Sequence, residues 1–257
     1  MTITPQAESS PGYDERSYGD SWAKIYDDPL LGWPSADPAV DYLWERVGAG
    51  RALELGVGTG RVAIPLARRG TRVLGLDSSA DMLSALHAKN VPGTLTTRQA
   101  DFLTFAADEP FDLVFCIGQT LLQLQTQAAQ RRCLEVAFES LRPCGALVVG
   151  AFTPDIKRFR VGQDWLTNKI DVDRLVTTAS LHLPGAQQIR SMTTITTESG
   201  TTLHPNFIRY VWPSELLLLA ELTGLELVDR RATYVGGSYT GNERTYVVEF
   251  RRPKLSS

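Results

Sequence analysis

A glycine turn directly after a short apolar run is the feature that most constrains this chain. Residues 51–55 (RALEL) read as a buried parallel strand, residues 56–60 (GVGTG) as the turn, and residues 61–69 as a helix. Glycines at alternate positions let the backbone approach a ligand closely, because a side chain there would fill the ligand's space. A second apolar run, residues 73–76, ends in Asp77, whose carboxylate can accept hydrogen bonds from a ribose diol. The two signals together predict a cofactor that contains a nucleoside.

The turn departs from the pattern of nicotinamide-binding folds. That pattern, G-x-G-x-x-G/A, has a small third residue that lets the helix pack tightly on the strand. Counted from Gly56 and Gly58, the third position is Arg61, which fits this role poorly. Glu54, at the end of the strand, suits a cationic ligand group better than a pyrophosphate, which it would repel. These residues favour a different nucleoside cofactor.

The E-x-G-x-G-x-G turn resembles the first motif of the class I S-adenosylmethionine (SAM)-dependent methyltransferases. The resemblance covers about residues 50–154 and the C-terminal hairpin, and includes residues 98–102, 111–117 and 141–149. It implies an α/β fold with a doubly wound, mostly parallel, Rossmann-like seven-stranded sheet that ends in an antiparallel hairpin, which nicotinamide folds usually lack. It also implies S-adenosyl-L-methionine as the cofactor and methyl transfer as the activity.

The resemblance assigns roles toward SAM to individual residues. Asp77 matches the ribose-binding acid, Met82 a position that often packs on the adenine, and Asp101 and Phe102 the groups that meet the adenine amino group and ring edge. Core packing is the alternative for Met82, and a loop cap is the alternative for Asp101. The expected cofactor-binding residues are Tyr18, Tyr26, Glu54, Gly56, Gly58, Gly60, Asp77, Ser78, Met82, Asp101, Phe102 and Ile117.

Catalytic residues need not stand out in such a chain, because the cofactor supplies the electrophile and the protein mainly positions the nucleophile. A hydroxyl acceptor would be helped by a general base, whereas an amine need only arrive deprotonated. His182 and His204 are the candidate bases, with a structural role as the alternative for each. Gln119 follows the fourth strand at the sheet edge where ligands bind, and Gln119 and Tyr210 are the candidate substrate contacts.

We expect one methyltransferase domain over residues 1–257. Residues 1–16 are polar and are expected to be poorly ordered, and residues 17–50 should form N-terminal cap helices. Residues 51–154 and 212–252 alternate short apolar strands with amphipathic helices, ending in two strands, and should form the Rossmann-like core.

Residues 155–211 interrupt that alternation. Residues 175–183 have strand periodicity, and residues 189–197 and 207–212 read as further strands, with turns at residues 184–185 and 199–200. We expect an antiparallel β meander inserted after strand five, which forms a substrate lid together with the N-terminal helix. Tyr18 and Tyr26 of that helix could contact the methionine end or the substrate, or could simply pack.

The composition of the chain limits the classes of partner that we expect it to bind. The net charge of -3 gives no basic field, so a nucleic acid is not expected as a partner. No stretch of about 18 apolar residues occurs, so no membrane partner is expected. Cys116, Cys133 and Cys144 lack the C-x-x-C spacing of zinc or redox sites, and we expect no metal and reduced thiols in a cytoplasmic protein.

The expected function is transfer of a methyl group from SAM to a nitrogen or oxygen of a small-molecule substrate. The general plan resembles bacterial methyltransferases of secondary metabolism that modify amino sugars, peptides or polyketides. Two alternatives stay open: a NAD-dependent oxidoreductase, and a protein of the SAM-binding fold that binds without catalysis. The acceptor, the use of a base, the pathway and the oligomeric state are not set by the residues.

Overall fold

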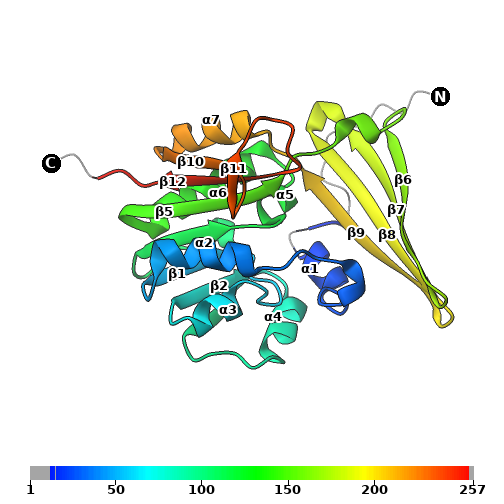
Figure 1. Ribbon diagram of the computed structural model, residues 1–257, viewed down its shortest axis with the longest axis horizontal. Helices are drawn as coiled ribbons and strands as arrows, with labels where there is room; N and C mark the ends of the chain where they lie inside the picture. Colours follow the sequence, from blue (N-terminus) through cyan, green and yellow to red (C-terminus); the bar gives the residue numbers. More distant parts are fainter. Residues whose placement is uncertain (1–11, 15, 255–257) are drawn as a thin grey trace.

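A mostly parallel sheet with helices on both faces forms the centre of the molecule in the computed structural model, which describes residues 12–14 and 16–254 (Figure 1). Most of the segment 1–16, which we expected to be poorly ordered, lies outside these residues. The strand order is β11-β10-β12-β5-β4-β1-β2-β3. The strands are β1 (Arg51–Leu55), β2 (Arg72–Asp77), β3 (Leu95–Gln99), β4 (Phe111–Cys116), β5 (Leu141–Phe152), β10 (Glu226–Thr233), β11 (Gly236–Ser238) and β12 (Thr245–Arg251).

The antiparallel end of the sheet is the part that nicotinamide folds usually lack. Strand β12 lies between β5 and β10 and pairs antiparallel with both, while β1 to β5 pair in parallel. The predicted fold class is therefore confirmed. The sheet has one more strand than the seven expected, because the three-residue β11 folds back onto β10 through a glycine-rich segment that carries no strand periodicity.

Two apolar clusters cover the two faces of the sheet. Leu53 and Leu55 of β1 point into one cluster, which includes side chains of α6 and α7, whereas Ala52 points into the other with α2 and α3. This alternation is the period of two that a strand requires. The helices are α1 (Ser17–Trp22), α2 (Asp37–Val47), α3 (Ala63–Arg68), α4 (Ala80–His87), α5 (Thr120–Gln123), α6 (Gln127–Ser140) and α7 (Pro213–Thr223), with short 3-10 turns η1 (Pro29–Leu31), η2 (Phe102–Thr104), η3 (Ile156–Arg158) and η4 (Pro184–Ala186).

Two helices of the core have typical capping residues. The N-cap of α4 is Ser79, whose hydroxyl accepts a hydrogen bond of 3.2 Å from the Met82 amide. Helix α7 begins at Pro213 and ends before Gly224, which has the left-handed φ of 87° that glycine tolerates.

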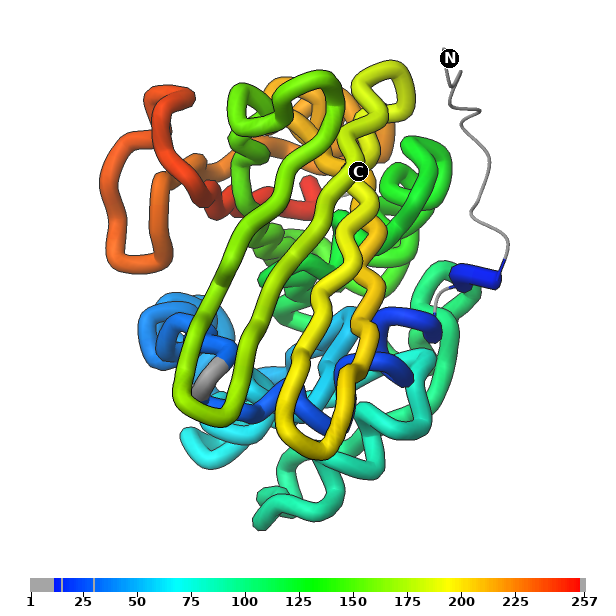
Figure 2. Tube along the Cα trace, turned by 90° about the vertical axis from the view of Figure 1, so that its right-hand side faces the viewer, coloured from blue at the N-terminus to red at the C-terminus, as the bar shows by residue number. Residues whose placement is uncertain are grey.

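A separate four-stranded antiparallel sheet follows β5, as the meander prediction required. Its order is β6-β7-β8-β9, with β6 (Gln163–Ile170), β7 (Arg174–Leu183), β8 (Gln188–Thr197) and β9 (Gly200–Arg209). Figure 2 shows these strands side by side in front of the core. Strand β6 was not predicted, because it is an edge strand whose side chains are mostly exposed and do not alternate. Strand β9 begins at Gly200, seven residues before the predicted start, because its first seven residues are mostly polar and include Pro205.

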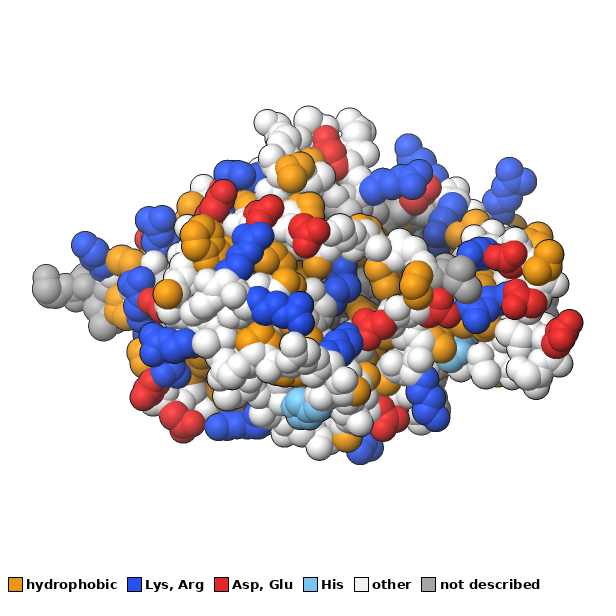
Figure 3. Space-filling view, turned by 60° about the horizontal axis from the view of Figure 1, so that its bottom comes forward, with side chains coloured by type: hydrophobic (Ala, Val, Ile, Leu, Met, Phe, Trp, Pro, Cys, Tyr) orange, Lys and Arg blue, Asp and Glu red, His pale blue; other side chains and the backbone are white. Residues whose placement is uncertain are grey.

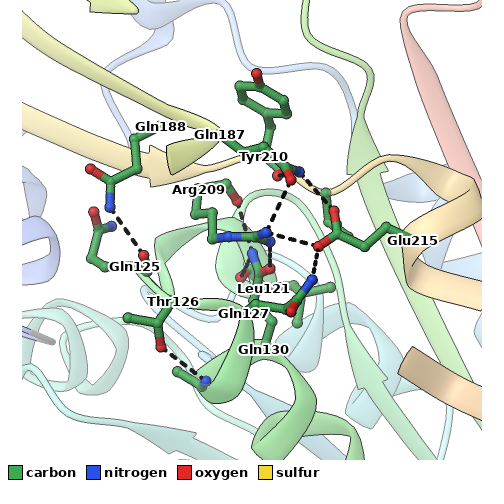
Figure 4. A network of polar contacts seen from close by, with 12 residues as sticks. Leu121, Gln125, Thr126, Gln127, Gln130, Gln187, Gln188, Arg209, Tyr210 and Glu215 are labelled. Atoms are coloured by element: carbon green, nitrogen blue, oxygen red, sulfur yellow. Dashed lines mark hydrogen bonds and ion pairs between the residues drawn. The ribbon is translucent and has the colours of Figure 1, made fainter. Parts of the chain in front are cut away.

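A buried polar network joins the second sheet to the helices of the core (Figure 4). The Arg209 guanidinium of β9 donates to Glu215 of α7 at 2.8 Å and to Gln130 of α6 at 2.5 Å. Gln187, before β8, donates to the same Glu215 carboxylate at 2.7 Å. Around this network, Ile189 and other apolar side chains of the second sheet belong to the same buried cluster as α6 and α7.

Within residues 12–14 and 16–254, every helix is too short or too polar to cross a lipid bilayer. In the same part of the chain, no group of three or more metal-ligating side chains comes together. Cys116 and Cys133 are buried free thiols, and Cys144 is a partly buried one.

Candidate active site

A cavity of about 610 Å³ opens at the carboxyl ends of β1, β2, β4 and β5. Ligands of open α/β sheets bind at this edge, because the strand order reverses there and leaves a crevice. The wall is completed by the N-terminal segment, including Tyr18 and Tyr26, and by the turn after β10. The cavity has the size typical of a small-molecule site.

The glycine turn forms the floor of one end of the cavity. Gly56 and Gly58 have left-handed φ values of 75° and 53°, and the Gly56 amide donates to the Leu76 carbonyl at 2.9 Å. A Cβ built on Gly58 meets nothing closer than the Met82 sulfur at 4.0 Å, so it would project into the open cavity. This position therefore leaves room for a ligand to approach the backbone.

The Asp77 carboxylate is held against this turn by backbone amides. Its two oxygens accept from Gly58 at 2.8 Å and from Ser79 at 2.9 Å. Burial raises the pKa of Asp77, and the two amides act in the opposite direction. The carboxylate is thus fixed at the cavity wall, with lone pairs left over for a ligand hydroxyl.

Glu54 is the most unusual group of the wall. Its side chain is 4% exposed, and its Oε2 atom has no hydrogen-bond partner among the described residues. Burial raises the pKa of this carboxyl well above its usual range, and the Arg61 guanidinium opposes that rise. A buried carboxylate is stable only with a partner, so this position fits a cationic ligand group.

Helix α1 covers part of the cavity and contributes Tyr18 and Gly19 to its wall. Gly19 lies so close to α4 that a Cβ there would be 2.4 Å from the Ser79 Cβ. Asp20 accepts a 2.6 Å hydrogen bond from the Ser79 hydroxyl, and the Trp22 indole donates to the Pro205 carbonyl of β9 at 2.9 Å. These contacts hold Tyr18, one turn away, against the cavity.

The other end of the cavity is largely apolar. Strands β4, β5, β10 and β12 and the segments after them line it with Ile117, Phe152, Tyr246 and their neighbours. The Tyr234 hydroxyl lies against Gly150, where a Cβ would be 2.0 Å from the hydroxyl oxygen. Burial raises the pKa of Tyr234, which keeps the hydroxyl protonated and able to donate.

Most of the residues that the sequence singled out meet at this cavity. Those on its wall are Tyr18, Tyr26, Glu54, Gly56, Gly58, Asp77, Ser78, Met82, Asp101, Phe102, Ile117 and Gln119. Asp101 also accepts from the Leu103 amide at 2.9 Å, and Met82 also packs on Trp22, so the alternative roles of a loop cap and core packing are present as well. Gly60 is not on the wall, because a Cβ there would lie 2.8 Å from the Ile64 side chain.

Three candidate residues of the inserted segment do not reach the cavity wall. His204 is buried, with its Nδ1 atom 2.8 Å from the Ser21 carbonyl and its Nε2 atom 2.8 Å from the Thr202 hydroxyl. His182 and Tyr210 hydrogen-bond each other at 3.0 Å, and burial lowers the pKa of His182. In this structure His204 therefore joins α1 to β9, and His182 of β7 pairs with Tyr210, which directly follows β9.

Several wall residues were missed because only the tertiary fold brings them to the cavity. They come from residues 33–39, 150–152, 233–235 and 245–247, and from the position of Arg61. The first segment has Trp33 and two prolines, which signal burial but not a ligand. Arg61 was visible only as a misfit to the nicotinamide pattern. No residue of the segment 155–211 lines the cavity, although we expected that segment to form part of the lid.

Comparison with known proteins gives the family. The sequence family described as a methyltransferase domain matches residues 52–145. The solved structure of the CcbJ methyltransferase from Streptomyces caelestis is 33% identical, with a TM-score of 0.88, and the match covers 94% of this chain and 100% of that one. The chain belongs to the class I SAM-dependent methyltransferases. This membership replaces the nicotinamide alternative and makes SAM the methyl donor.

The methyltransferase is similar to two further proteins. The cypemycin N-terminal methyltransferase of Streptomyces sp is 28% identical over 227 residues, which are 87% of this chain and 89% of that protein. SAM-bound CalS10, an amino pentose methyltransferase from Micromonospora echinaspora involved in calicheamicin biosynthesis, is 21% identical with a TM-score of 0.67, covering 90% of this chain and 96% of that one. The second similarity concerns the fold alone.

The cavity of the methyltransferase fits this cofactor on its own geometry. Glu54 offers an unpaired buried oxygen to a cation, Asp77 offers lone pairs to a diol, and Gly58 leaves open space beside them. SAM carries an ammonium group, a ribose diol and an adenine, which match these features in kind.

Proposed function

We propose that the methyltransferase methylates the nitrogen of a small, largely apolar amine. Bound SAM supplies an electrophilic methyl group on a sulfonium. The chain itself has to bind both molecules, align the acceptor nitrogen with that methyl group and keep water out. The observation that carries the proposal is the distribution of charge on the cavity wall.

The charged side chains of the wall are Glu54, Arg61, Asp77 and Asp101, and all of them lie in or after β1, β2 or β3. The half of the wall formed by β4, β5, β10 and β12 has no charged side chain and no histidine among the described residues. A hydroxyl acceptor would need a base in that half, whereas a neutral amine already has its lone pair. The amine nitrogen forms the new bond as the carbon–sulfur bond breaks, and its surplus proton leaves to solvent.

The charged half would hold the cofactor. Asp77 would accept from the ribose hydroxyls, Met82 would pack on the adenine, and Asp101 and Phe102 would meet the adenine edge. Glu54 would bind the methionine ammonium, which supplies the cation that this buried carboxylate lacks. Ser78, the glycine turn, Ile117, Tyr18 and Tyr26 would complete the enclosure.

Gln119 would orient the acceptor. Its Oε1 atom accepts a 3.0 Å hydrogen bond from Asn206 of β9, and Asn206 in turn accepts from Gln123 at 2.8 Å. The carbonyl oxygen of Gln119 is therefore engaged, and its amide N–H groups are left for the cavity. In this arrangement the inserted segment 155–211 acts on the substrate site indirectly, through Gln119 and α1, and not as a wall.

The acceptor class that this wall favours is a primary or secondary amine on an apolar body. The cypemycin relative is named an N-terminal methyltransferase, and a free N-terminus is a primary or secondary amine. We propose that the acceptor is a free small molecule or the end of a short peptide. On the face shown in Figure 3, acidic and basic side chains are interspersed. This face therefore has no basic stripe of the kind that binds a nucleic acid.

The cofactor half is tested by replacing the ribose-binding acid. Asp77→Asn keeps the size of the side chain but removes its charge, so affinity for S-adenosylhomocysteine should fall by about 1.5–3 kcal/mol in calorimetric titration. Asp81→Asn, an exposed acid on the next helix, is the matched control and should bind normally. Unchanged affinity in Asp77→Asn would remove this residue from the site.

A further inference from the structure

A chain of directional hydrogen bonds runs from the N-terminal segment to the cavity wall. The Tyr13 hydroxyl donates to the Gln123 Oε1 atom at 3.2 Å. The Gln123 Nε2 group donates to Asn206 Oδ1 at 2.8 Å, and the Asn206 Nδ2 group donates to Gln119 Oε1 at 3.0 Å. Gln123 and Gln119 line the cavity, and the other two residues do not. The chain therefore ends on a residue that faces the ligand space.

The direction of this chain is set at its start by a group that can only donate. A side-chain amide can turn and exchange its oxygen and nitrogen, so its neighbours decide which of the two faces where. The Phe207 backbone N–H donates to the Tyr13 hydroxyl oxygen at 3.2 Å, and the two rings stack at 4.4 Å. Burial raises the pKa of Tyr13 to about 12, so the hydroxyl keeps its proton and donates it onward. Each amide that follows accepts through its oxygen and donates through its nitrogen.

Gln119 consequently presents hydrogen-bond donors to the cavity. Its Oε1 atom is engaged by Asn206, and its Nε2 group has no hydrogen bond to a described residue. The next side chain, Thr120, lies against the glycine turn, since a Cβ on Gly56 would be 2.5 Å from the Thr120 Cγ2 atom. Gln119 therefore lies where the charged half of the cavity meets the uncharged half, close to the place where the methyl group is transferred.

We propose that the acceptor amine carries an uncharged oxygen, such as a carbonyl, close to the nitrogen that is methylated, and that Gln119 Nε2 donates to this oxygen. The inference rests on the proposed function and narrows its amines to molecules such as α-amino amides, which include the end of a short peptide. A carboxylate would fit poorly, because a neutral N–H cannot compensate a buried charge. Asn206, Gln123 and Tyr13 are positioning residues, which fix the end of the Gln119 amide that meets the substrate.

Calorimetric titration at pH 8 of the full chain, saturated with S-adenosylhomocysteine, tests this with three amines of one skeleton. Leucine N,N-dimethylamide offers a carbonyl that only accepts, leucinol a hydroxyl that donates or accepts, and 2-amino-4-methylpentane neither. Asn206→Asp puts a carboxylate beside Gln119, so the Gln119 amide should turn and present its oxygen. Relative to 2-amino-4-methylpentane, the dimethylamide should then lose about 3- to 10-fold in affinity, the worth of one hydrogen bond, whereas leucinol should not.

Asn168→Asp is the matched control, because it makes the same change at an exposed position of β6 and should leave the three affinities in the same ratio. If Asn206→Asp does not fold, Gln119→Glu decides, since a carboxylate there also presents only acceptors and should give the same selective loss. Tyr13→Phe removes the hydroxyl at the start of the chain and should shift the ratio in the same direction.

Four results would overturn the proposal: no binding of the dimethylamide to the unaltered protein, a dimethylamide that loses no more than leucinol, an equal loss of all three amines, or a loss confined to S-adenosylhomocysteine. The last would assign the Gln119 N–H to the cofactor. Because binding is measured and not turnover, amines that bind in the expected ratios but are not methylated would contradict the proposed function and leave this inference standing.

Discussion

At the scale of single residues, the acceptor end of the cavity depends on the contact between Gly150 and Tyr234. The Tyr234 ring meets the Tyr42 ring edge-on at 5.8 Å, and the Tyr42 hydroxyl donates to Glu249 at 2.9 Å. Arg46 pairs with the same carboxylate at 2.6 Å. Tyr234 is therefore packed against a tyrosine that is itself held by the Glu249 carboxylate, which restricts its movement.

Gly150→Ala should lower the free energy of unfolding by about 1–3 kcal/mol, because the new methyl group overlaps the Tyr234 hydroxyl. Adding Tyr234→Phe removes that oxygen and leaves the nearest ring carbon 3.1 Å away, so the double variant should recover most of the loss. Urea unfolding measures both. A single variant as stable as the unaltered protein would show that the Tyr234 contact is loose.

The sequence was enough to predict wall residues that belong to one continuous stretch of chain. The glycine turn and Asp77 lie within residues 51–77, where a strand, a turn, a helix and a second strand that ends in an acid are a readable pattern. Tyr234 could not be found in this way, because only the pairing of β10 with β12 brings it to the cavity. His204 was a candidate base because it is a histidine of the inserted segment, yet its partners are the Ser21 backbone carbonyl and Thr202.

At the scale of elements, α1 must dock on α4 to cover the cofactor half. Gly19→Ala should push the two helices apart, because its Cβ would overlap the Ser79 side chain. Since α1 lies outside the two large core clusters, stability should change little while affinity for S-adenosylhomocysteine falls by about 1–3 kcal/mol in calorimetric titration. Lys24→Ala, exposed on the same segment, should bind normally. Normal binding by Gly19→Ala would mean that α1 does not cover the ligand.

The ion pair between Arg209, at the end of β9, and Glu215 of α7 should make the stability of the folded protein sensitive to acid. Burial acts to raise the pKa of Glu215, but hydrogen bonds from Gln187, Gln127 and Arg209 lower it overall. Because the folded pKa is below the unfolded value of about 4.3, the stabilisation is complete above that pH and is lost as the pH falls through the folded pKa.

Glu215→Gln should therefore cost about 3–5 kcal/mol of unfolding free energy at pH 7, where it leaves Arg209 buried without its anion. The cost should shrink below about pH 4, where the unaltered protein also loses the charge. Urea unfolding at both pH values measures this. An equal cost at both would show that the charge of Glu215 contributes nothing.

Secondary structure was predictable where the pattern was periodic and capped. Strands β1, β2 and β7 alternate or are continuously apolar, and α7 has Pro213 and Gly224 at its ends. Strand β6 has neither signal, since as an edge strand it is specified mainly by pairing with β7. The early start of β9 is likewise set by its register with β8.

At the scale of the whole molecule, we propose that residues 1–257 form a single domain, with core and inserted sheet folding as one unit. Ile189 and Ile208 of the second sheet share a buried cluster with α6. The hydrogen bond from Arg209 to Gln130 of α6 crosses the same interface. Scanning calorimetry should therefore show one transition with matching calorimetric and van't Hoff enthalpies. Two separated transitions would show that the inserted sheet unfolds independently.

Methyl transfer itself tests the central claim most directly. The protein would be incubated with SAM that carries a deuterated methyl group and with matched pairs of small apolar molecules, each pair differing only in an amine or a hydroxyl at one position. Mass spectrometry locates the label. The uncharged acceptor half of the cavity predicts labelled nitrogen in the amine member and no label in its hydroxyl partner. Label on the hydroxyl oxygen, or on no amine of the panel, would contradict the account.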